Sequence, residues 1–278
     1  MIKGKNISLK ELQMISLNIL EYFHNICEEH NIKYSLGGGT LIGAIRHQGF
    51  IPWDDDIDVY MLWSEYQKFV SVWNKFNHDY YQLSPIETFD GDVAGEMAKI
   101  YDMRTYLAER HRSSHIFIDI FVLDYVPSDL DLLYKSMKKH RRLKLRFSSL
   151  KKRFYRAKDN SLMKKIFGKL AQFFYQKMQT NLSWLRENYN EKNSENIGLF
   201  LSDYGGWQKS YMPKEYFSKF EKVKFEDKYF YVTKNYHEHL TDYYGNYMQL
   251  PPENERMPKH GTWNMECILE GISQEKFL

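Results

Sequence analysis

The fold of this chain is decided by the stretch Gly38-Gly39-Thr40-Leu41-Ile42-Gly43-Ala44-Ile45-Arg46-His47-Gln48-Gly49-Phe50-Ile51-Pro52-Trp53-Asp54-Asp55-Asp56-Ile57-Asp58. Its glycine-rich start allows backbone N–H groups to approach a phosphate closely. At its end we expect a strand, on which Asp56 and Asp58 share one face while Ile57 points into the core. Two carboxylates this close repel each other unless a cation neutralises them. A hard ion such as Mg²⁺ suits oxygen ligands and substrate phosphates, so the stretch indicates phosphoryl-type chemistry.

A third acid lies in the strongest strand signal of the chain, His115-Ile116-Phe117-Ile118-Asp119-Ile120-Phe121. An ionised carboxylate among apolar residues is costly to bury unless it is paired or bound to a metal. We therefore expect Asp56, Asp58 and Asp119 to converge as catalytic residues and as ligands of Mg²⁺, with Mn²⁺ as the substitute ion. Asp54 and Asp55 are weaker, supporting candidates. The non-enzymatic alternative is a scaffold whose acids bind a structural cation or remain solvated.

Bulk properties limit the class of protein. The chain has 278 residues, of which 43% are hydrophobic, enough for one large domain or a domain with a second lobe. It has no apolar run of about 18 residues, and its first residues do not resemble a signal peptide. Cys27 and Cys267 form no CxxC motif and no disulfide framework. We therefore expect a cytoplasmic protein.

Hydrophobic periodicity and punctuation predict alternating helices and strands. Capping boxes predict helices that begin at Ser8 and Ser64, and Gly49 is expected as a left-handed cap of the helix that starts at Thr40. A hairpin is expected to turn at Glu226-Asp227. The expected helices cover 8–31, 40–47, 64–73 and 235–244, and the expected strands cover 34–36, 54–59, 81–86, 96–101, 115–121 and 222–232.

The segment from Lys135 to Met178 is strongly basic. It holds 16 Lys/Arg and one acid, Asp159. An apolar stripe follows one side of its second half, formed by Leu162, Ile166, Leu170, Phe173 and Phe174. No nucleic-acid-binding motif accompanies it, so we expect no nucleic acid partner. A solvated helical pair is one interpretation. The other is contact with a polyanion, either the inner face of an anionic membrane or the pyrophosphate of a lipid-linked acceptor.

Three blocks of the chain resemble one known family. The opening stretch, Phe117-Ile118-Asp119-Ile120-Phe121-Val122-Leu123-Asp124 and the tail Tyr244-Gly245-Asn246-Tyr247-Met248-Gln249-Leu250-Pro251-Pro252-Glu253 resemble the LicD-type choline-phosphotransferase family. That family lies within the nucleotidyltransferase-fold superfamily and is similar to the fukutin-related transferases. The basic segment is not part of the resemblance. Asn246 stands where such proteins often have Asp, which alters that loop.

The resemblance implies an α+β fold, with a nucleotidyltransferase-like mixed sheet flanked by helices. The charge pattern adds a basic helical insert to it. The expected parts are a catalytic core over 1–128, the insert over 129–187 and a C-terminal part over 188–278 that completes the active-site cleft. The implied activity is Mg²⁺-dependent transfer of phosphocholine from CDP-choline to a hydroxyl of a cell-surface glycan or its lipid-linked precursor, of teichoic acid, lipopolysaccharide or capsule type. Transfer of ribitol phosphate or glycerol phosphate, and nucleotidyl transfer from an NTP, are the enzymatic alternatives.

Further site residues are expected around this chemistry. Those expected to bind the donor are Gly38, Gly39, Thr40, Arg46, His47, Trp53, Lys99 and Arg104. Those expected to contact the transferred group or the acceptor are Trp207, Tyr247, Arg256 and His260. Aromatic faces attract a quaternary ammonium, so an aromatic cage would suit choline. The other aromatic residues considered for its walls are Tyr204, Tyr211, Tyr243, Tyr244 and Trp263.

Overall fold

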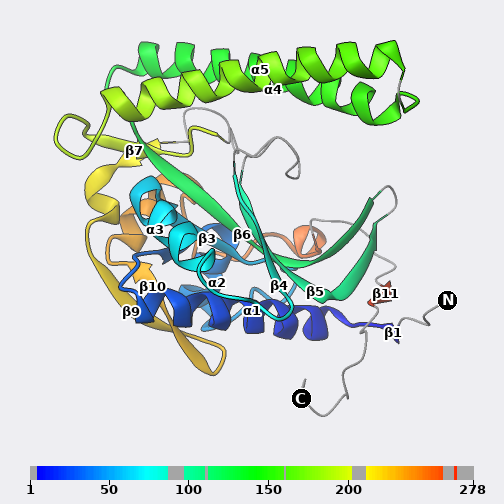
Figure 1. The fold of residues 1–278 in the computed structure, drawn as a ribbon. Helices are drawn as coiled ribbons and strands as arrows, with labels where there is room; N and C mark the ends of the chain where they lie inside the picture. The colour runs from blue at the N-terminus through cyan, green and yellow to red at the C-terminus, as the bar shows by residue number, and fades with distance from the viewer. Residues whose placement is uncertain are drawn as a thin grey trace. The chain divides into compact units, whose positions relative to one another are not determined.

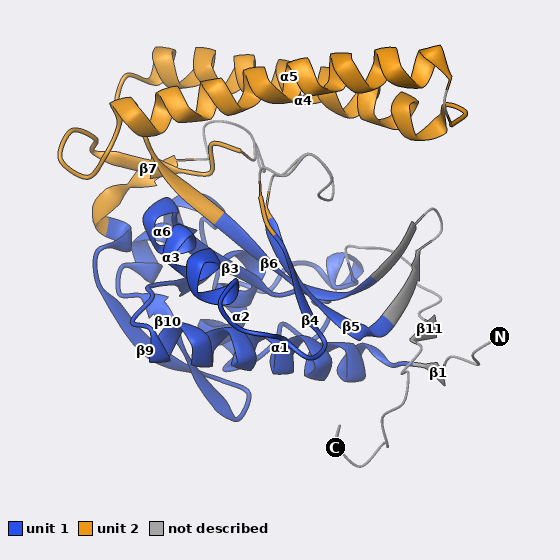
Figure 2. Ribbon diagram, viewed as in Figure 1, with its two compact units in different colours: residues 1–84, 98–121, 216–278 blue, residues 85–97, 122–215 orange. Residues whose placement is uncertain are grey.

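The computed structural model describes residues 5–86, 97–109, 112–159, 161–201, 211–258 and 266–267 (Figure 1). The chain forms two compact units (Figure 2). Unit 1 combines residues 1–84, 98–121 and 216–278, and unit 2 combines 85–97 and 122–215. Unit 1 therefore joins all three blocks of the sequence resemblance, apart from the last residues of the second block.

Unit 1 is built on one sheet with the strand order β2-β3-β6-β5-β4. These strands are β2 (Ser35–Leu36), β3 (Asp58–Leu62), β4 (Tyr81–Ser84), β5 (Ala98–Glu109) and β6 (Arg112–Val126). The chain also forms the antiparallel pairs β1 (Lys5–Asn6) with β11 (Glu266–Cys267), and β9 (Phe220–Phe225) with β10 (Lys228–Thr233). The predicted hairpin turn at Glu226-Asp227 is confirmed, since Phe225 pairs with Lys228.

The helices of unit 1 are α1 (Leu9–Glu29), α2 (Gly38–His47), α3 (Trp63–Trp73) and α6 (Tyr236–Tyr244), with a short 3-10 helix over Glu253–Glu255. The capping box at Ser8 is confirmed, because Ser8 Oγ accepts from Glu11 N while Ser8 N donates to Glu11 Oε2. The buried side of α1 packs Phe23 against Tyr34 and Phe69. The predicted α+β fold with a mixed sheet is confirmed.

Four local predictions around the signature stretch are wrong. α2 starts at Gly38, not Thr40, and the left-handed residue that ends it is Gln48, with φ of 56°, not Gly49. α3 starts at Trp63 after Leu62, whose side chain makes no cap, so the capping box at Ser64 does not form. β3 starts only at Asp58, so strand alternation cannot align Asp56 with it.

Unit 2 contains α4 (Leu130–Arg156) and α5 (Leu162–Asn188), two helices that lie side by side (Figure 1). Phe147 of α4 and Ala171 and Met178 of α5 form their shared core, and Phe174 packs against it. The expected single stripe on α5 is therefore divided, since Phe174 faces the core while Leu162 and its stripe neighbours are exposed.

The rest of unit 2 extends from the end of β6. Residues 124–126 pair with β7 (Asn196–Gly198), which pairs with β8 (Tyr211–Pro213). A 3-10 helix follows over Lys214–Phe217, and unit 2 ends within it at Glu215. Arg186 of α5 donates to the buried Asp124 at 2.7 Å, which ties the helical pair to this strand. Among the described residues, no helix has both the length and the apolar character needed to span a membrane.

Candidate active site

The acids of the signature stretch lie in a loop that α1 holds in place. Side-chain oxygens of Asp54, Asp55 and Asp56 all lie within 4.8 Å of one another, and each residue is partly buried. The buried Gln13 of α1 donates its amide to the backbone oxygen of Asp54 at 2.8 Å. This arrangement could hold a metal ion, because oxygen ligands this close repel each other unless a cation is shared among them.

Asp58 connects the acidic loop to the start of α2. Its backbone N–H donates to Thr40 Oγ1 at 2.9 Å, and its carbonyl accepts from Gly37 N at 2.9 Å. Both bonds fix the first residue of β3 against the first turn of the helix. Thr40 therefore positions Asp58 through its side chain. Its expected contact with the donor stays a prediction.

The glycines of α2 leave room for carboxylates. A Cβ on Gly38 would collide with Asp58 Oδ2, and Gly38 has a φ of 50°. A Cβ on Gly39 would lie 2.6 Å from Asp54 Oδ2. The two acids therefore pack directly against the N-terminal turn of α2, where the helix dipole favours negative charge. Phosphate binding by this turn stays a prediction.

Asp119 lies on β6, the strand next to β3. Its N–H donates to the carbonyl of Ile57 at 2.8 Å, which places it beside the acidic loop. Lys99, directly opposite on β5, forms an ion pair with Asp119 and lies 3.5 Å from the centre of the Phe117 ring. Lys99 thus lies beside the acids, and its expected contact with the donor stays a prediction.

Electrostatics show that these carboxylates act on one another. Burial raises the pKa of Asp58 well above its usual value, and the charges of Asp56, Asp119 and Asp54 raise it further. The charge of Lys99 lowers the pKa of Asp58 but offsets only part of this increase. A cation would offset this repulsion, so the chemistry of the donor set fits a metal ion.

A second group of expected residues gathers around Trp53. Arg46 donates to the carbonyl of Tyr247 at 2.6 Å and to His47 Nε2 at 2.9 Å. The rings of His47 and Trp53 lie 6.5 Å apart, and the Arg256 guanidinium carbon lies 5.8 Å from the Trp53 ring centre. Burial lowers the pKa of Arg46, while the charge of Asp54 raises it. Arg46 therefore links the tail of the chain to the acidic loop.

The two aromatic residues of the tail occupy different surroundings. Tyr247 is buried, and its hydroxyl shares a 3.0 Å hydrogen bond with His237 Nδ1. Tyr244 is 43% exposed, yet burial around its hydroxyl raises its pKa, as do Tyr60 and the acids Asp58 and Asp54. Among the described residues, Tyr244 is thus one candidate wall residue close to the acids, whereas Tyr247, which the sequence favours, is buried.

The remaining expected residues lie elsewhere or are not described. Arg104 donates to Asp102 through Nε at 2.8 Å and lies 3.5 Å from the Tyr80 ring centre. Its guanidinium is thus occupied within the β4–β5 part of the sheet. Trp207 and His260 lie outside the described residues.

Glu226 is a residue that sequence reasoning missed. From the tip of the β9–β10 hairpin, its Oε1 accepts from Phe50 N at 3.1 Å and its Oε2 accepts from Lys10 Nζ at 3.2 Å. Its own N–H donates to the carbonyl of Gln48 at 2.8 Å. The hairpin therefore clamps the segment between α2 and the acidic loop. The turn was visible in the sequence, but its docking partner was not.

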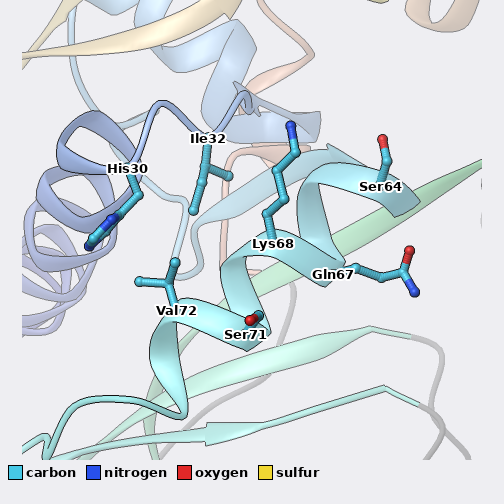
Figure 3. Close-up of a pocket in the computed structure, with 7 residues that line it drawn as sticks. All are labelled: His30, Ile32, Ser64, Gln67, Lys68, Ser71 and Val72. Carbon is cyan, nitrogen blue, oxygen red and sulfur yellow. The ribbon is translucent and has the colours of Figure 1, made fainter.

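A surface pocket of about 550 Å³ lies between the end of α1 and α3 (Figure 3). Its lining residues are His30, Ile32, Ser64, Gln67, Lys68, Ser71 and Val72. None of them is an acid, and Lys68 is paired with Glu65 at 2.6 Å. The pocket therefore lacks the chemistry of the acidic site.

The chain that carries this site is similar to known proteins. The family LicD/FKTN/FKRP, nucleotidyltransferase domain, matches residues 31–128, which include the acidic loop and Asp119. The lipopolysaccharide cholinephosphotransferase LicD of Haemophilus influenzae is 55% identical over 257 residues, 92% of this chain and 97% of that protein.

More distant similarities are confined to parts of the chain. The human ribitol 5-phosphate transferase FKRP is 45% identical over 38 residues, 14% of this chain and 8% of that protein. An uncharacterized protein of Rickettsia typhi is 29% identical over 122 residues, 44% of this chain and 38% of that protein. The similarity to the Haemophilus protein extends over nearly the whole chain.

Proposed function

Because this chain belongs to the LicD family of phosphotransferases, we propose that it transfers phosphocholine from CDP-choline to a hydroxyl of a cell-surface glycan or of its lipid-linked precursor. The 55% identity to a lipopolysaccharide cholinephosphotransferase, over 97% of that protein, carries this proposal. The raised pKa of Asp58 among three other carboxylates supports it, since such a cluster suits a metal-assisted reaction on phosphates.

The choice of the phosphorus that is attacked rests on the family membership of the chain. The acceptor oxygen attacks the phosphorus that carries choline, the bond from that phosphorus to CMP breaks, and CMP leaves with the electron pair. Asp119, which forms an ion pair with Lys99, takes the proton of the acceptor hydroxyl. Positioning and charge neutralisation supply most of the rate in such reactions.

We assign the cofactor to Mg²⁺, with Mn²⁺ as a substitute, held by Asp56, Asp58 and Asp119 with Asp54 and Asp55 close by. The ion would neutralise charge on the donor pyrophosphate. Gly38, Gly39 and Arg46 lie at the edge of this cluster and suit a diphosphate. Tyr244 and Trp53 offer aromatic faces for the trimethylammonium group, each worth about 0.5–2 kcal/mol.

Donor choice tests the proposal. The purified chain is incubated with Mg²⁺, an acceptor glycan and, in separate reactions, CDP-choline, CDP-ribitol, CDP-glycerol or NTPs. Release of CMP from CDP-choline, with phosphocholine on the glycan, is expected. Pyrophosphate released from an NTP would identify a nucleotidyltransferase instead, and faster turnover of CDP-ribitol would favour the chemistry named for FKRP.

We place the protein at the inner face of the membrane, peripherally, with residues 135–178 in contact with anionic lipid. The excess of basic residues in this segment supports the placement. A lipid-linked acceptor would be presented at that surface, so such contact would keep enzyme and acceptor together.

A further inference from the structure

Helix α5 carries two apolar stripes with different environments. Ala171, Phe174 and Met178 face α4 and are covered by it. The second stripe, called here the exposed stripe, consists of Leu162, Met163, Ile166, Leu170 and Phe173, which are between 40% and 72% exposed. Its members recur three and four residues apart, so they line one side of the helix. Only the first stripe contributes to the core shared by α4 and α5, and the second stripe is exposed to solvent.

Positive charge borders the exposed stripe. Lys165, Lys169 and Lys177 are all exposed, and Lys177 Nζ lies 5.6 Å from the Phe173 ring centre. The single acid of segment 135–178 is Asp159, which is paired with Lys164. The surface therefore combines exposed apolar side chains with cations and lacks compensating negative charge.

A surface with exposed apolar side chains and lysines favours one kind of binding partner. A second copy of the chain would bring the same positive charge to the contact and repel it. Nucleic acid phosphates would pair with the lysines but would leave the apolar side chains in water. An anionic bilayer satisfies both features, because its headgroups attract the lysines and its acyl boundary accepts the apolar side chains.

We propose that the exposed stripe of α5 docks on an anionic membrane surface, with Leu162, Ile166, Leu170 and Phe173 inserted below the headgroups. Binding therefore depends on apolar insertion as well as on charge. This docking rests on the membrane placement proposed above and assigns it to one face of α5, but it does not depend on the proposed transfer reaction.

Vesicle co-sedimentation of the full chain tests the docking. Binding is expected to vesicles of phosphatidylcholine mixed with phosphatidylglycerol, and to weaken when salt is raised. The triple variant Leu162→Gln/Ile166→Gln/Leu170→Gln is expected to bind at least about tenfold more weakly at unchanged net charge, because apolar area is no longer removed from water. Circular dichroism checks that its helices are retained.

Leu145→Gln is the matched control. Leu145 is 62% exposed on α4, close to the 72% of Leu162, but lies outside the stripe. The control is expected to bind like the original chain, and Leu162→Gln alone more weakly. Equal loss in both variants, equal binding to pure phosphatidylcholine vesicles, or no binding to mixed vesicles would overturn the proposal.

Two further measurements separate the alternatives. Sedimentation equilibrium is expected to show the same mass for the original chain and the triple variant. A dimer that the triple variant abolishes, with vesicle binding unchanged, would assign the stripe to self-association instead. CMP release from CDP-choline with a water-soluble acceptor is expected to be equal in both chains. If the original chain releases no CMP yet binds vesicles, the proposed reaction fails and the docking stands.

Discussion

The ionised form of Asp58 is costly, since burial and three neighbouring carboxylates raise the pKa of its carboxyl group. Asp58→Asn removes this charge but keeps the backbone bonds to Thr40 and Gly37. We expect loss of Mg²⁺-dependent CMP release by at least about a hundredfold, with an unfolding temperature that is unchanged or higher. Turnover and thermal unfolding are measured on the same preparation. Retained turnover would remove Asp58 from the metal ligands.

Gly38 is required for space and for its backbone conformation. In Gly38→Ala, the added methyl group collides with Asp58 Oδ2, and a φ of 50° costs an L-residue about 1–2 kcal/mol. We expect Gly38→Ala to be less stable to urea than the original chain. We also expect it to lose more activity than Gly43→Ser, a variant in the middle of α2 whose added atom meets the backbone of Gly49. Equal activity in Gly38→Ala and the original chain would show that the acids can move apart.

The acids Asp56, Asp58 and Asp119 could be identified from the sequence because each has apolar neighbours in the chain, which is a local pattern. This pattern assigned Asp56 and Asp58 to one strand face, but β3 begins at Asp58 and Asp56 lies in the preceding loop. The pattern did not predict that carboxylates of the chain lie beside Gly38 and Gly39, and phosphate binding by this turn stays a prediction. Which group fills the space beside a glycine depends on contacts between distant segments, and periodicity does not encode them.

At the scale of elements, the β9–β10 hairpin acts as a clamp on the segment that leads to the acids. Glu226→Ala removes the acceptor of Phe50 N, and losing one such bond costs about 1–3 kcal/mol. We expect roughly tenfold lower kcat with a higher Mg²⁺ requirement, because the acidic loop is less well positioned. Activity is measured across a Mg²⁺ titration.

Matched variants separate positioning by Glu226 from general stability. Glu226→Gln keeps an oxygen for Phe50 N and is expected to remain close to the original chain. Lys10→Met removes only the exposed ion pair on the other oxygen, so its effect should be small. If Glu226→Ala lowers the unfolding temperature but leaves the Mg²⁺ requirement unchanged, the hairpin supports the fold only.

Helix ends show why element boundaries were predicted unevenly. The capping box at Ser8 formed because its side chains and backbone suffice to make it. At Ser64 the same pattern did not cap a helix, since β3 leads directly into α3 at Trp63. The start of α3 is therefore set by the strand that precedes it, whereas the start of α1 is set by local side-chain hydrogen bonds.

At the scale of the molecule, the chain order does not follow the compact units. Unit 1 closes with residues 216–278, which bring Tyr244, Tyr247 and Arg256 beside the signature stretch. The sequence resemblance predicted that the tail belongs with the signature, but the basic character of 135–178 indicated only a polyanion partner. That α5 exposes a second apolar stripe became visible once its packing against α4 was known.

Each unit also contains a buried histidine, and this predicts how stability depends on pH. Burial lowers the pKa of His140 in unit 2 and of His239 in unit 1 to about 4. Between pH 6.5 and 4 these two histidines bind more protons in the unfolded chain than in the folded chain, so their contribution to stability falls as pH falls. Each histidine should cost about 2 kcal/mol between pH 7 and pH 5.

The raised pKa of Asp58 acts in the opposite direction, so the effect of one histidine must be isolated by comparing variants. His140 Nδ1 is buried without a partner, so His140→Leu removes a titrating group at little packing cost. Urea unfolding at pH 7 and pH 5 is expected to show a smaller loss of stability in His140→Leu than in the original chain. The difference should be confined to unfolding that includes α4 and α5, because His140 packs beside Phe200 within unit 2. An identical loss in both chains would mean that His140 is charged in the folded state and that its burial does not govern its titration.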